Sequence, residues 1–249
     1  MDDLRVLDVR VDDIDRSGLE HSILAGVRNG RSKLFAYVNV HAVNIAWSDD
    51  RFREIINNAS VSYCDGEGVR VAAKMLGRQL PPRTVLTYWV WDLCRLLERE
   101  GLSVYFLGAR ETVVAKAVAV LREQYPRLKI AGWHHGYFRK EGDESSRIVG
   151  EINSASPDVL FVGFGMPLQE YWIDENLGSL RAGVVLPSGS MIDYIAGEKK
   201  PTPSWMANSG LEWLYRLLRE PRRLWKRYLL GNPLFILRVI ARRIRFGRL

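Results

Sequence analysis

Short apolar runs rich in β-branched residues alternate with helix-type patterns along most of the chain, and this alternation most restricts the possible folds. Such an alternation is typical of βαβ units, whose strands pair side by side in a parallel sheet. The expected strands span residues 4–11, 34–40, 61–64, 103–107, 128–132, 159–162 and 183–186. The expected helices include residues 49–58, 68–76, 89–100, 112–124 and 169–176. We therefore predict an α/β fold with a mostly parallel sheet.

Chain length and charge distribution predict one core with a C-terminal appendage. A chain of 249 residues, 47% of them hydrophobic, can bury one sizeable core. Residues 211–249 hold eleven Lys and Arg residues against two Glu residues, a local net charge of +9, so the preceding residues carry −2 of the overall +7. We expect a core at residues 1–209 and a basic, amphipathic, membrane-associating appendage at residues 210–249. Its helix should restart at Pro221, because proline is tolerated only in a helix's first turn.

The sequence favours a cytoplasmic protein that lies on the inner face of the cell membrane. Its acidic start lacks the pattern of a secretory signal, and no apolar run reaches the roughly 18 to 20 residues needed to span a bilayer. The two cysteines, Cys64 and Cys94, are too few for a disulfide framework and lack metal-ligand spacing. His134 and His135 should point to opposite faces of a strand, with no third ligand spaced with them. We expect no metal and no cofactor.

Three expected strands run directly into glycine or an acidic residue. These turns begin at Asp65, at Gly108 and at Gly163, which is followed by Gly165. In open α/β sheets the ligand crevice lies outside the carboxyl ends of the strands. The three turns therefore indicate the position of a binding site.

Asp65 follows an expected buried strand and precedes an expected helix. In that position a carboxylate can point into the crevice and accept a proton from an attacking hydroxyl group. Aspartate is also among the preferred N-cap residues of helices, and helix caps are commoner than catalytic bases. Both interpretations stay open at this point.

The glycine turns suit a phosphate group, although the signal is weak. Gly163 and Gly165 allow a ligand to approach the backbone, and the first turn of the following helix offers free N–H groups for a diphosphate. A lone Gly-x-Gly more often reflects tight packing. Gln169 in that helix either hydrogen-bonds sugar hydroxyls or is simply solvated. Arg110, two residues after Gly108, either faces a phosphate group or is an ordinary surface charge.

The basic tail carries Arg216, Arg223 and Arg227 at spacings of seven and four residues, with apolar and aromatic residues among them. On a helix beginning at Pro221 the last two share a face. Basic amphipathic helices with Trp and Tyr are typical of interfacial membrane anchors. The alternative is a helix that packs on the core and exposes a charged face.

Four segments together resemble the WecG/TagA/CpsF family of bacterial glycosyltransferases. They are residues 38–41, 65–69 and 163–170 and the run GLEWLYRLLREPRRLWKRYLLGNP at residues 210–233, in matching order within residues 34–239. The resemblance implies a Rossmann-like core, an open sheet with helices on both faces. It also implies inverting, metal-independent transfer from a UDP-sugar to a polyprenyl-diphosphate-linked sugar, in cell-surface polysaccharide or teichoic acid biosynthesis.

The resemblance assigns roles to residues of this chain. Asp65 looks like the general base, Asn39 and Gln169 look like sugar-positioning residues, and Arg83 looks like a site arginine. The C-terminal arginines are expected to close over the site and bind diphosphate, with the UDP-sugar at the turns near Gly108 and Gly163. The chain departs from the family at Tyr37, where threonine is frequent, and at residues 84–88, where a glycine-containing stretch is commoner. The donor sugar is therefore either an N-acetylmannosamine type or a hexose.

Two other classes fit parts of the sequence. An NAD-dependent oxidoreductase would explain the glycine turns, but the full Gly-x-Gly-x-x-Gly and its downstream acid are missing. A non-enzymatic, basic nucleic-acid-binding protein would explain the tail, which carries no recognised nucleic-acid-binding motif. We expect a UDP-sugar, a lipid-linked acceptor and an anionic membrane surface as partners, and no nucleic acid. Apolar surface under the tail could equally be buried against a second copy of the chain, which would make a homo-oligomer.

Overall fold

A six-stranded, wholly parallel sheet forms the centre of the molecule, in the order β4-β3-β8-β7-β5-β6. The structure is a computed structural model that describes residues 4–28 and 30–246. The strands are β3 (Lys33–Val38), β4 (Val61–Cys64), β5 (Ser103–Gly108), β6 (Lys129–His134), β7 (Val159–Gly163) and β8 (Val184–Pro187). The predicted parallel sheet is confirmed, with most strand ends within two residues of those expected.

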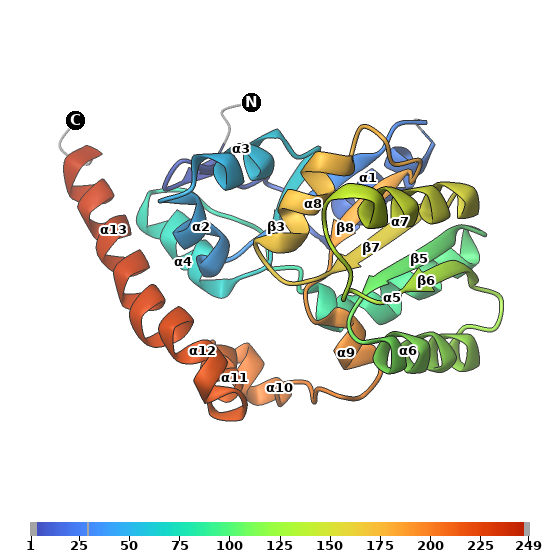
Figure 1. Cartoon of the computed structure of the whole chain (residues 1–249). Helices are drawn as coiled ribbons and strands as arrows, with labels where there is room; N and C mark the ends of the chain where they lie inside the picture. The colour runs from blue at the N-terminus through green and yellow to red at the C-terminus, as the bar shows by residue number, and fades with distance from the viewer. Residues whose placement is uncertain (1–3, 29, 247–249) are drawn as a thin grey trace.

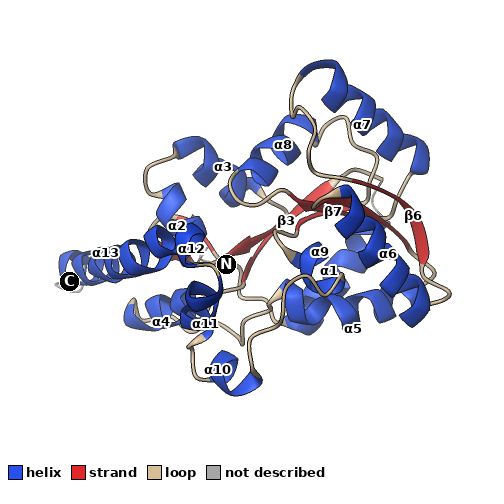
Figure 2. Cartoon of the chain, turned by 60° about the horizontal axis from the view of Figure 1, so that its bottom comes forward, coloured by secondary structure: helices blue, strands red, loops and turns tan. Residues whose placement is uncertain are grey.

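Helices cover both faces of this sheet (Figures 1 and 2). One face carries α1 (Arg16–Val27), α5 (Leu86–Arg99), α6 (Glu111–Gln124) and α9 (Met191–Ile195). The other carries α2 (Val40–Ala46), α3 (Asp50–Asn58), α4 (Glu67–Met75), α7 (Gly142–Ala155) and α8 (Leu168–Asn176). Successive side chains of a strand point to opposite faces, so Phe35 enters one core while Leu34 and Ala36 enter the other.

The N-terminal segment differs from the prediction of one strand at residues 4–11. It forms a two-stranded antiparallel sheet of β1 (Arg5–Val6) and β2 (Val9–Arg10), separate from the main sheet. The chain reverses because Leu7 and Asp8 both adopt positive φ angles, of 51° and 68°. Helices α1, α2 and α7 were not predicted either, and α7 begins within the segment 134–144 that has the composition of a loop.

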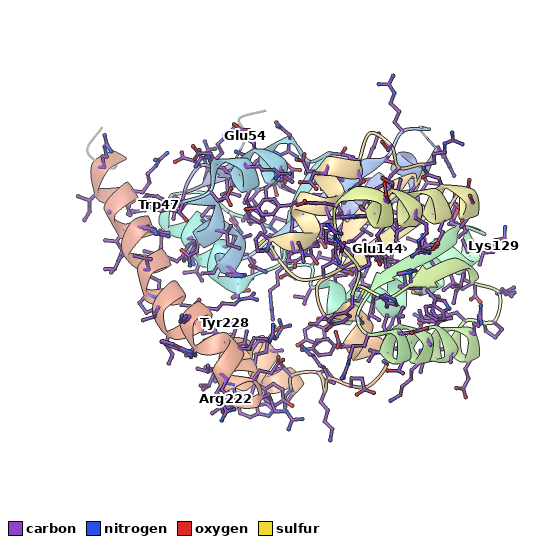
Figure 3. The ribbon with its side chains drawn as sticks, in the orientation of Figure 1. Trp47, Glu54, Lys129, Glu144, Arg222 and Tyr228 are labelled. Atoms are coloured by element: carbon purple, nitrogen blue, oxygen red, sulfur yellow. The ribbon has the colours of Figure 1, made fainter. Side chains whose placement is uncertain are left out.

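The C-terminal segment turns back over the carboxyl ends of the strands (Figure 1). It comprises α10 (Ser204–Asn208), α11 (Glu212–Arg219), α12 (Pro221–Trp225), the π-helical turn η1 (Lys226–Leu230) and α13 (Gly231–Phe246). The helix restarts at Pro221 as predicted. Helix α13 packs beside α2 and α4 and buries Phe235 and Val239. The Arg238 guanidinium lies 4.6 Å from the ring centroid of Trp47, which is labelled in Figure 3.

Within the described residues, no helix has both the length and the apolar character required to cross a bilayer.

Candidate active site

A cavity of about 1710 Å³ lies between the carboxyl ends of the strands and the C-terminal helices. Every strand of the main sheet contributes a lining residue within two positions of its end, and these residues are Asn39, Asp65, Ala109, Gly136, Phe164 and Ser188. Parallel sheets place their ligands at this edge. The cavity is thus the candidate active site.

Asn39 connects the first turn of α2 to the carboxylate of Asp65. Its Oδ1 accepts hydrogen bonds from the backbone N–H groups of His41 and Ala42, at 3.0 and 3.1 Å, so Asn39 is the N-cap of α2. Its Nδ2 donates to Asp65 Oδ2 at 3.1 Å. The N-cap of α4 is Gly66, which makes no side-chain cap bond. The capping interpretation of Asp65 is therefore wrong, and its side chain lines the cavity instead.

Burial raises the pKa of Asp65 above its ordinary value, and the nearby Glu212 carboxylate raises it further. The hydrogen bond from Asn39 and the positive charges of Arg216 and Arg83 act in the opposite direction. A carboxylate with a raised pKa binds a proton more tightly than an exposed one. Asp65 combines access to the cavity with the chemistry of a general base.

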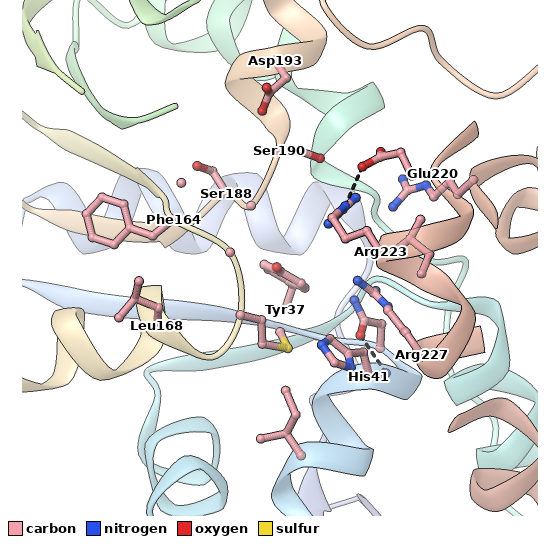
Figure 4. A pocket seen from close by; sticks show the side chains of 18 of the residues that line it. Tyr37, His41, Phe164, Leu168, Ser188, Ser190, Asp193, Glu220, Arg223 and Arg227 are labelled. Carbon is pink, nitrogen blue, oxygen red and sulfur yellow. Dashed lines mark hydrogen bonds and ion pairs between the residues drawn. The ribbon is translucent and has the colours of Figure 1, made fainter. Parts of the chain in front are cut away.

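Arg216, Arg223 and Arg227, from α11, α12 and η1, line the cavity opposite the sheet, and Arg238 of α13 lines it as well. Figure 4 shows Arg223 and Arg227 pointing from α12 and η1 toward Tyr37. Arg216 is paired with Glu212 at 2.6 Å, and Arg223 with Glu220. The expectation that Arg223 and Arg227 share a face agrees with this arrangement. The cavity thus has a cationic wall, which is suited to an anionic ligand.

Gln169 lies behind the cavity wall rather than on it. Its side chain is fully buried, so the interpretation as a solvated residue is wrong. Its Oε1 accepts hydrogen bonds from the N–H groups of Gly165 and Gly189, both at 3.1 Å. Its Nε2 donates to the Tyr37 hydroxyl at 3.1 Å and to Glu170 Oε1 at 2.8 Å. Gln169 therefore joins the loops that follow β7 and β8, and its amide is already fully engaged.

The glycines at the strand ends allow the backbone segments to approach closely. A Cβ on Gly108, whose φ is +157°, would lie 2.6 Å from the carbonyl oxygen of Gly163. A Cβ on Gly163 would lie 2.8 Å from the carbonyl oxygen of Gly189. Gly165 has a φ of +87°, and its N–H is engaged by Gln169. These contacts favour the packing interpretation of the glycine turns, although Gly163 and Gly165 also line the cavity.

Comparison with known proteins matches residues 4–248 to the glycosyl transferase WecG/TagA/CpsF family. The chain belongs to this glycosyltransferase family. It is 32% identical over 203 residues to an N-acetylglucosaminyldiphosphoundecaprenol N-acetyl-beta-D-mannosaminyltransferase of Staphylococcus aureus (strain MW2), covering 81% of this chain and 77% of the relative. It is 28% identical over 195 residues to an enzyme of the same name from Bacillus spizizenii (strain W23), covering 78% and 74%. The predicted family is confirmed, and the match extends beyond residues 34–239 at both ends.

Membership in the WecG/TagA/CpsF family excludes the oxidoreductase and the nucleic-acid-binding protein as the class of this chain. The fold agrees with the implied Rossmann-like core, because the sheet is open and parallel with helices on both faces.

Arg83 is not part of the main cavity of this glycosyltransferase. It lines a separate cavity of about 410 Å³, together with Arg70, Tyr88 and Trp89. Its guanidinium donates to Glu212 Oε2 at 2.7 Å and to the carbonyl oxygen of Ala207 at 3.1 Å. The structure thus brings the predicted site residues Asn39, Asp65, Arg216, Arg223 and Arg227 to one cavity and leaves Arg83 outside it.

Two further residues of the cavity received no role from the residue pattern. Burial and the positive charges of Arg227 and Arg223 lower the pKa of His41 to about 4, so its imidazole is neutral at physiological pH. Burial raises the pKa of the Tyr37 hydroxyl, which therefore stays protonated. The sequence signal that could have found Tyr37 is the alternation along β3, since it places this residue on a defined face of the sheet. For His41 the sequence offers no signal beyond its place in the family motif.

The two adjacent histidines do not point apart as expected. The ring centroids of His134 and His135 are 4.3 Å apart, because β6 ends at His134 and the chain turns there. His134 Nδ1 lies 2.8 Å from the carbonyl oxygen of His135. Across the part of the chain that the structure describes, no three His, Cys, Asp or Glu side chains are grouped so that they could hold a metal ion.

Proposed function

We propose that this chain transfers an N-acetylmannosamine-type sugar or a hexose from a UDP-sugar to a sugar linked to polyprenyl diphosphate, with inversion at the anomeric carbon. The names of the relatives support this, since they describe N-acetylmannosaminyl transfer to N-acetylglucosaminyl diphosphoundecaprenol. The single observation that carries the proposal is the placement of the Asp65 carboxylate in a cavity whose other wall holds Arg216, Arg223 and Arg227. The product serves cell-envelope polysaccharide or teichoic acid synthesis.

Asp65 acts as the general base of this reaction. Asn39 holds Oδ2, and Oδ1 accepts no hydrogen bond from any described residue. Oδ1 takes the proton of the acceptor hydroxyl while that oxygen forms a bond to the anomeric carbon. The bond from this carbon to the β-phosphate oxygen breaks on the opposite face, and UDP leaves with the electron pair. A base of this kind contributes roughly 10² to 10⁴-fold in rate.

The cationic wall stabilises the diphosphate in place of a metal ion. Charge-assisted hydrogen bonds from arginine to phosphate are among the strongest in proteins. Arg216 and Arg223 are already paired with carboxylates, whereas Arg227 makes no ion pair with a carboxylate of the described chain. Arg227 is therefore the group that most directly neutralises the leaving UDP. Neutral His41 lies near it without adding positive charge.

We infer that the C-terminal helices lie on an anionic membrane surface, with the cavity next to it. Helix α13 and the turn before it expose an apolar set of residues, namely Leu229, Leu230, Leu234, Ile236, Leu237, Ile240 and Ile244. Basic residues lie among them, and this combination is typical of helices that lie in the membrane interface. Leu230 and Leu234 also line the cavity. The lipid-facing surface and the cavity are thus continuous, which suits an acceptor whose diphosphate enters the site while its polyprenyl chain stays in the membrane.

Ligand-dependent thermal unfolding tests the donor class. Purified protein with a chelator and no added metal is heated with UDP, UDP-hexoses, UDP-N-acetylhexosamines, NAD or ATP. A ligand at 100 times its dissociation constant stabilises a protein by about 2.7 kcal/mol, so selective stabilisation by UDP compounds is expected. Equal stabilisation by all nucleotides, or by NAD alone, would contradict the proposed donor.

A further inference from the structure

Glu212, the first residue of α11, joins the core to the cationic wall of the cavity. Its side chain is 12% exposed. Its Oε2 accepts a hydrogen bond from Arg83 at 2.7 Å, and its Oε1 lies 2.6 Å from an Arg216 guanidinium nitrogen. We propose that Glu212 is a positioning residue that fixes Arg216 in the cavity by tying it to Arg83 of the core. Only the expected effects on catalysis rest on the proposed function; the structural role of Glu212 does not.

Arg83 supplies the fixed end of this connection. The next residue, Thr84, donates its N–H to the carbonyl oxygen of Cys64 at 2.9 Å, immediately before Asp65. Arg83 also donates to the carbonyl oxygen of Ala207, and its Nε lies 3.9 Å from a carboxylate oxygen of Glu67. Its guanidinium is therefore held by groups on several sides of it. Arg83 thus acts through Glu212 and does not itself contact the donor or the acceptor.

Arg216 is the end that the connection positions. It lines the cavity four residues after Glu212 on the same helix, and its guanidinium lies 6.0 Å from the Tyr194 ring centroid. Its Nε is buried and donates to none of the described residues. An unpartnered buried donor is costly, so the guanidinium keeps hydrogen-bonding capacity that a phosphate oxygen in the cavity would use once Nε turns toward it. The geometry therefore matches an arginine that is held ready for an anionic ligand.

Helix α11 depends on this polar connection because none of its apolar side chains is fully buried; the Trp213 ring, 6.2 Å from that of Tyr228, is only partly covered. Glu212 is the only buried residue of α11, all of which the structure describes. By contrast, α13 is anchored to the core by the buried side chains of Phe235 and Val239. Removing the carboxylate would leave two guanidinium groups close together without their shared counter-charge. Local loosening of α11, with α13 still docked, is the expected result.

Hydrogen exchange of Glu212→Gln tests this arrangement without reference to activity. We expect amides of residues 212–219 to exchange at least about ten times faster, because local opening of α11 costs less free energy once the ion pairs of Glu212 are gone. Residues 231–246 should keep their exchange rates. The matched control is Glu151→Gln, which removes an exposed pair with Arg147 on α7 and should leave both segments unchanged. Unchanged exchange in α11, or loosening of the whole chain, would overturn the proposal.

A double-mutant cycle with Arg83→Gln tests whether Arg83 acts through Glu212. Each single variant should lower kcat/KM about 10- to 100-fold, and the double variant should lose little more, because both remove one connection. Multiplying losses would show that Arg83 has an independent role and would overturn the inference.

The acid limb of the pH–rate profile separates positioning from loss of structure. The charged groups that face Asp65 are Arg83, Arg216 and Glu212, and the hydrogen-bond donor is Asn39. Tyr37, Tyr63 and Cys64 lie near it in neutral form. Without the Glu212 carboxylate the pKa of Asp65 falls, so the acid limb of Glu212→Gln should move to lower pH; an unmoved limb would count against the proposal.

If the wild-type protein transfers no sugar from UDP-sugars, the proposed function fails, and the exchange comparison still decides the role of Glu212.

Discussion

Asn39 holds Asp65 and the first turn of α2 with opposite ends of one amide, since Nδ2 donates to Asp65 Oδ2 at 3.1 Å while Oδ1 caps the helix. The end of β3 and the end of β4 are thereby joined across the edge of the sheet. Side-chain substitutions can separate the two roles. Aspartate and serine both cap helices, but an ionised aspartate cannot donate a hydrogen bond to the Asp65 carboxylate.

Asn39→Asp should keep the helix cap and lose the support of Asp65. The new carboxylate cannot donate while ionised, and it repels Asp65, so the pKa of Asp65 rises further. We expect the acid limb of the pH–rate profile to move to higher pH and kcat to fall about ten- to hundred-fold, the worth of a hydrogen bond to a charged group. Asn39→Ser, which retains a cap without the negative charge, is the control for stability. An acid limb that stays in place would contradict the role of Asn39.

Glu170→Gln should remove a pH-dependent loss of stability. Burial raises the pKa of Glu170 from 4.5 to about 7, and its Oε2 has no partner among the described residues. Between these pH values the unfolded chain is ionised while the folded protein holds the proton, so the stability contribution present below pH 4.5 is lost as pH rises through 7. The variant should gain up to about 3 kcal/mol relative to wild type at pH 8 and nothing at pH 4. Denaturant unfolding at both pH values measures the difference, and an equal gain at each would contradict it.

Gly163→Ala should destabilise the sheet edge. The added methyl group meets the carbonyl oxygen of Gly189 at 2.8 Å and Ser188 Oγ at 3.0 Å. Overpacking of this kind costs about 1–3 kcal/mol, visible as a lower Tm. Gly150→Ala is the matched control, since nothing lies within 4 Å of its added Cβ in the interior of α7 and alanine favours a helix there. Equal Tm changes in the two variants would argue against close packing at the strand ends.

Arg227→Gln should weaken diphosphate binding more than an equal loss of charge elsewhere on the same segment. Arg222 is exposed, does not line the cavity and lies on the outer side in Figure 3, so Arg222→Gln is the control. We expect stabilisation by UDP to need at least about ten-fold more ligand in Arg227→Gln, since charge-assisted bonds contribute about 1.5–3 kcal/mol. UDP titrations that give the same dissociation constant for both variants would remove Arg227 from the site.

Replacing Leu237 and Ile244 by Gln should release the chain from lipid. Both side chains are more than half exposed on α13, so the fold does not need them. Burying one such side chain contributes about 1.5–3 kcal/mol, and vesicle partition should fall at least ten-fold for the pair. Cosedimentation with anionic vesicles measures this, with exposed Val71→Gln as the control on α4. Unchanged partition would mean that this face does not meet the membrane.

The sequence predicted the sheet and the position of Asp65 because both depend on local patterns. A buried strand that ends in an acidic residue places that residue at the sheet edge whatever the rest of the chain does. The short α2 was missed because residues 39–40 also fit the end of a strand, and only the cap bonds of Asn39 decide between the two.

Contacts between distant residues could not be predicted in the same way. The bond between Gln169 and Tyr37 spans 132 positions, and the bond between Arg83 and Glu212 spans 129. Neither pair has a spacing or a composition that marks it. The family resemblance singled out Gln169, Arg83 and Tyr37 as site residues or departures, but the contacts that define their roles depend on the packed structure.

Transfer of labelled N-acetylmannosamine or hexose from UDP to a short-chain polyprenyl-diphosphate N-acetylglucosamine, by wild type and Asp65→Asn, tests the central claim most directly. The asparagine keeps the size of the side chain and can still accept the bond from Asn39. Because burial penalises the charged aspartate, the variant should be at least as stable as wild type at pH 7. We expect wild type to form product with inverted anomeric configuration and the folded variant to be slower by roughly 10² to 10⁴-fold. A folded Asp65→Asn with near wild-type turnover would show that Asp65 is not the base.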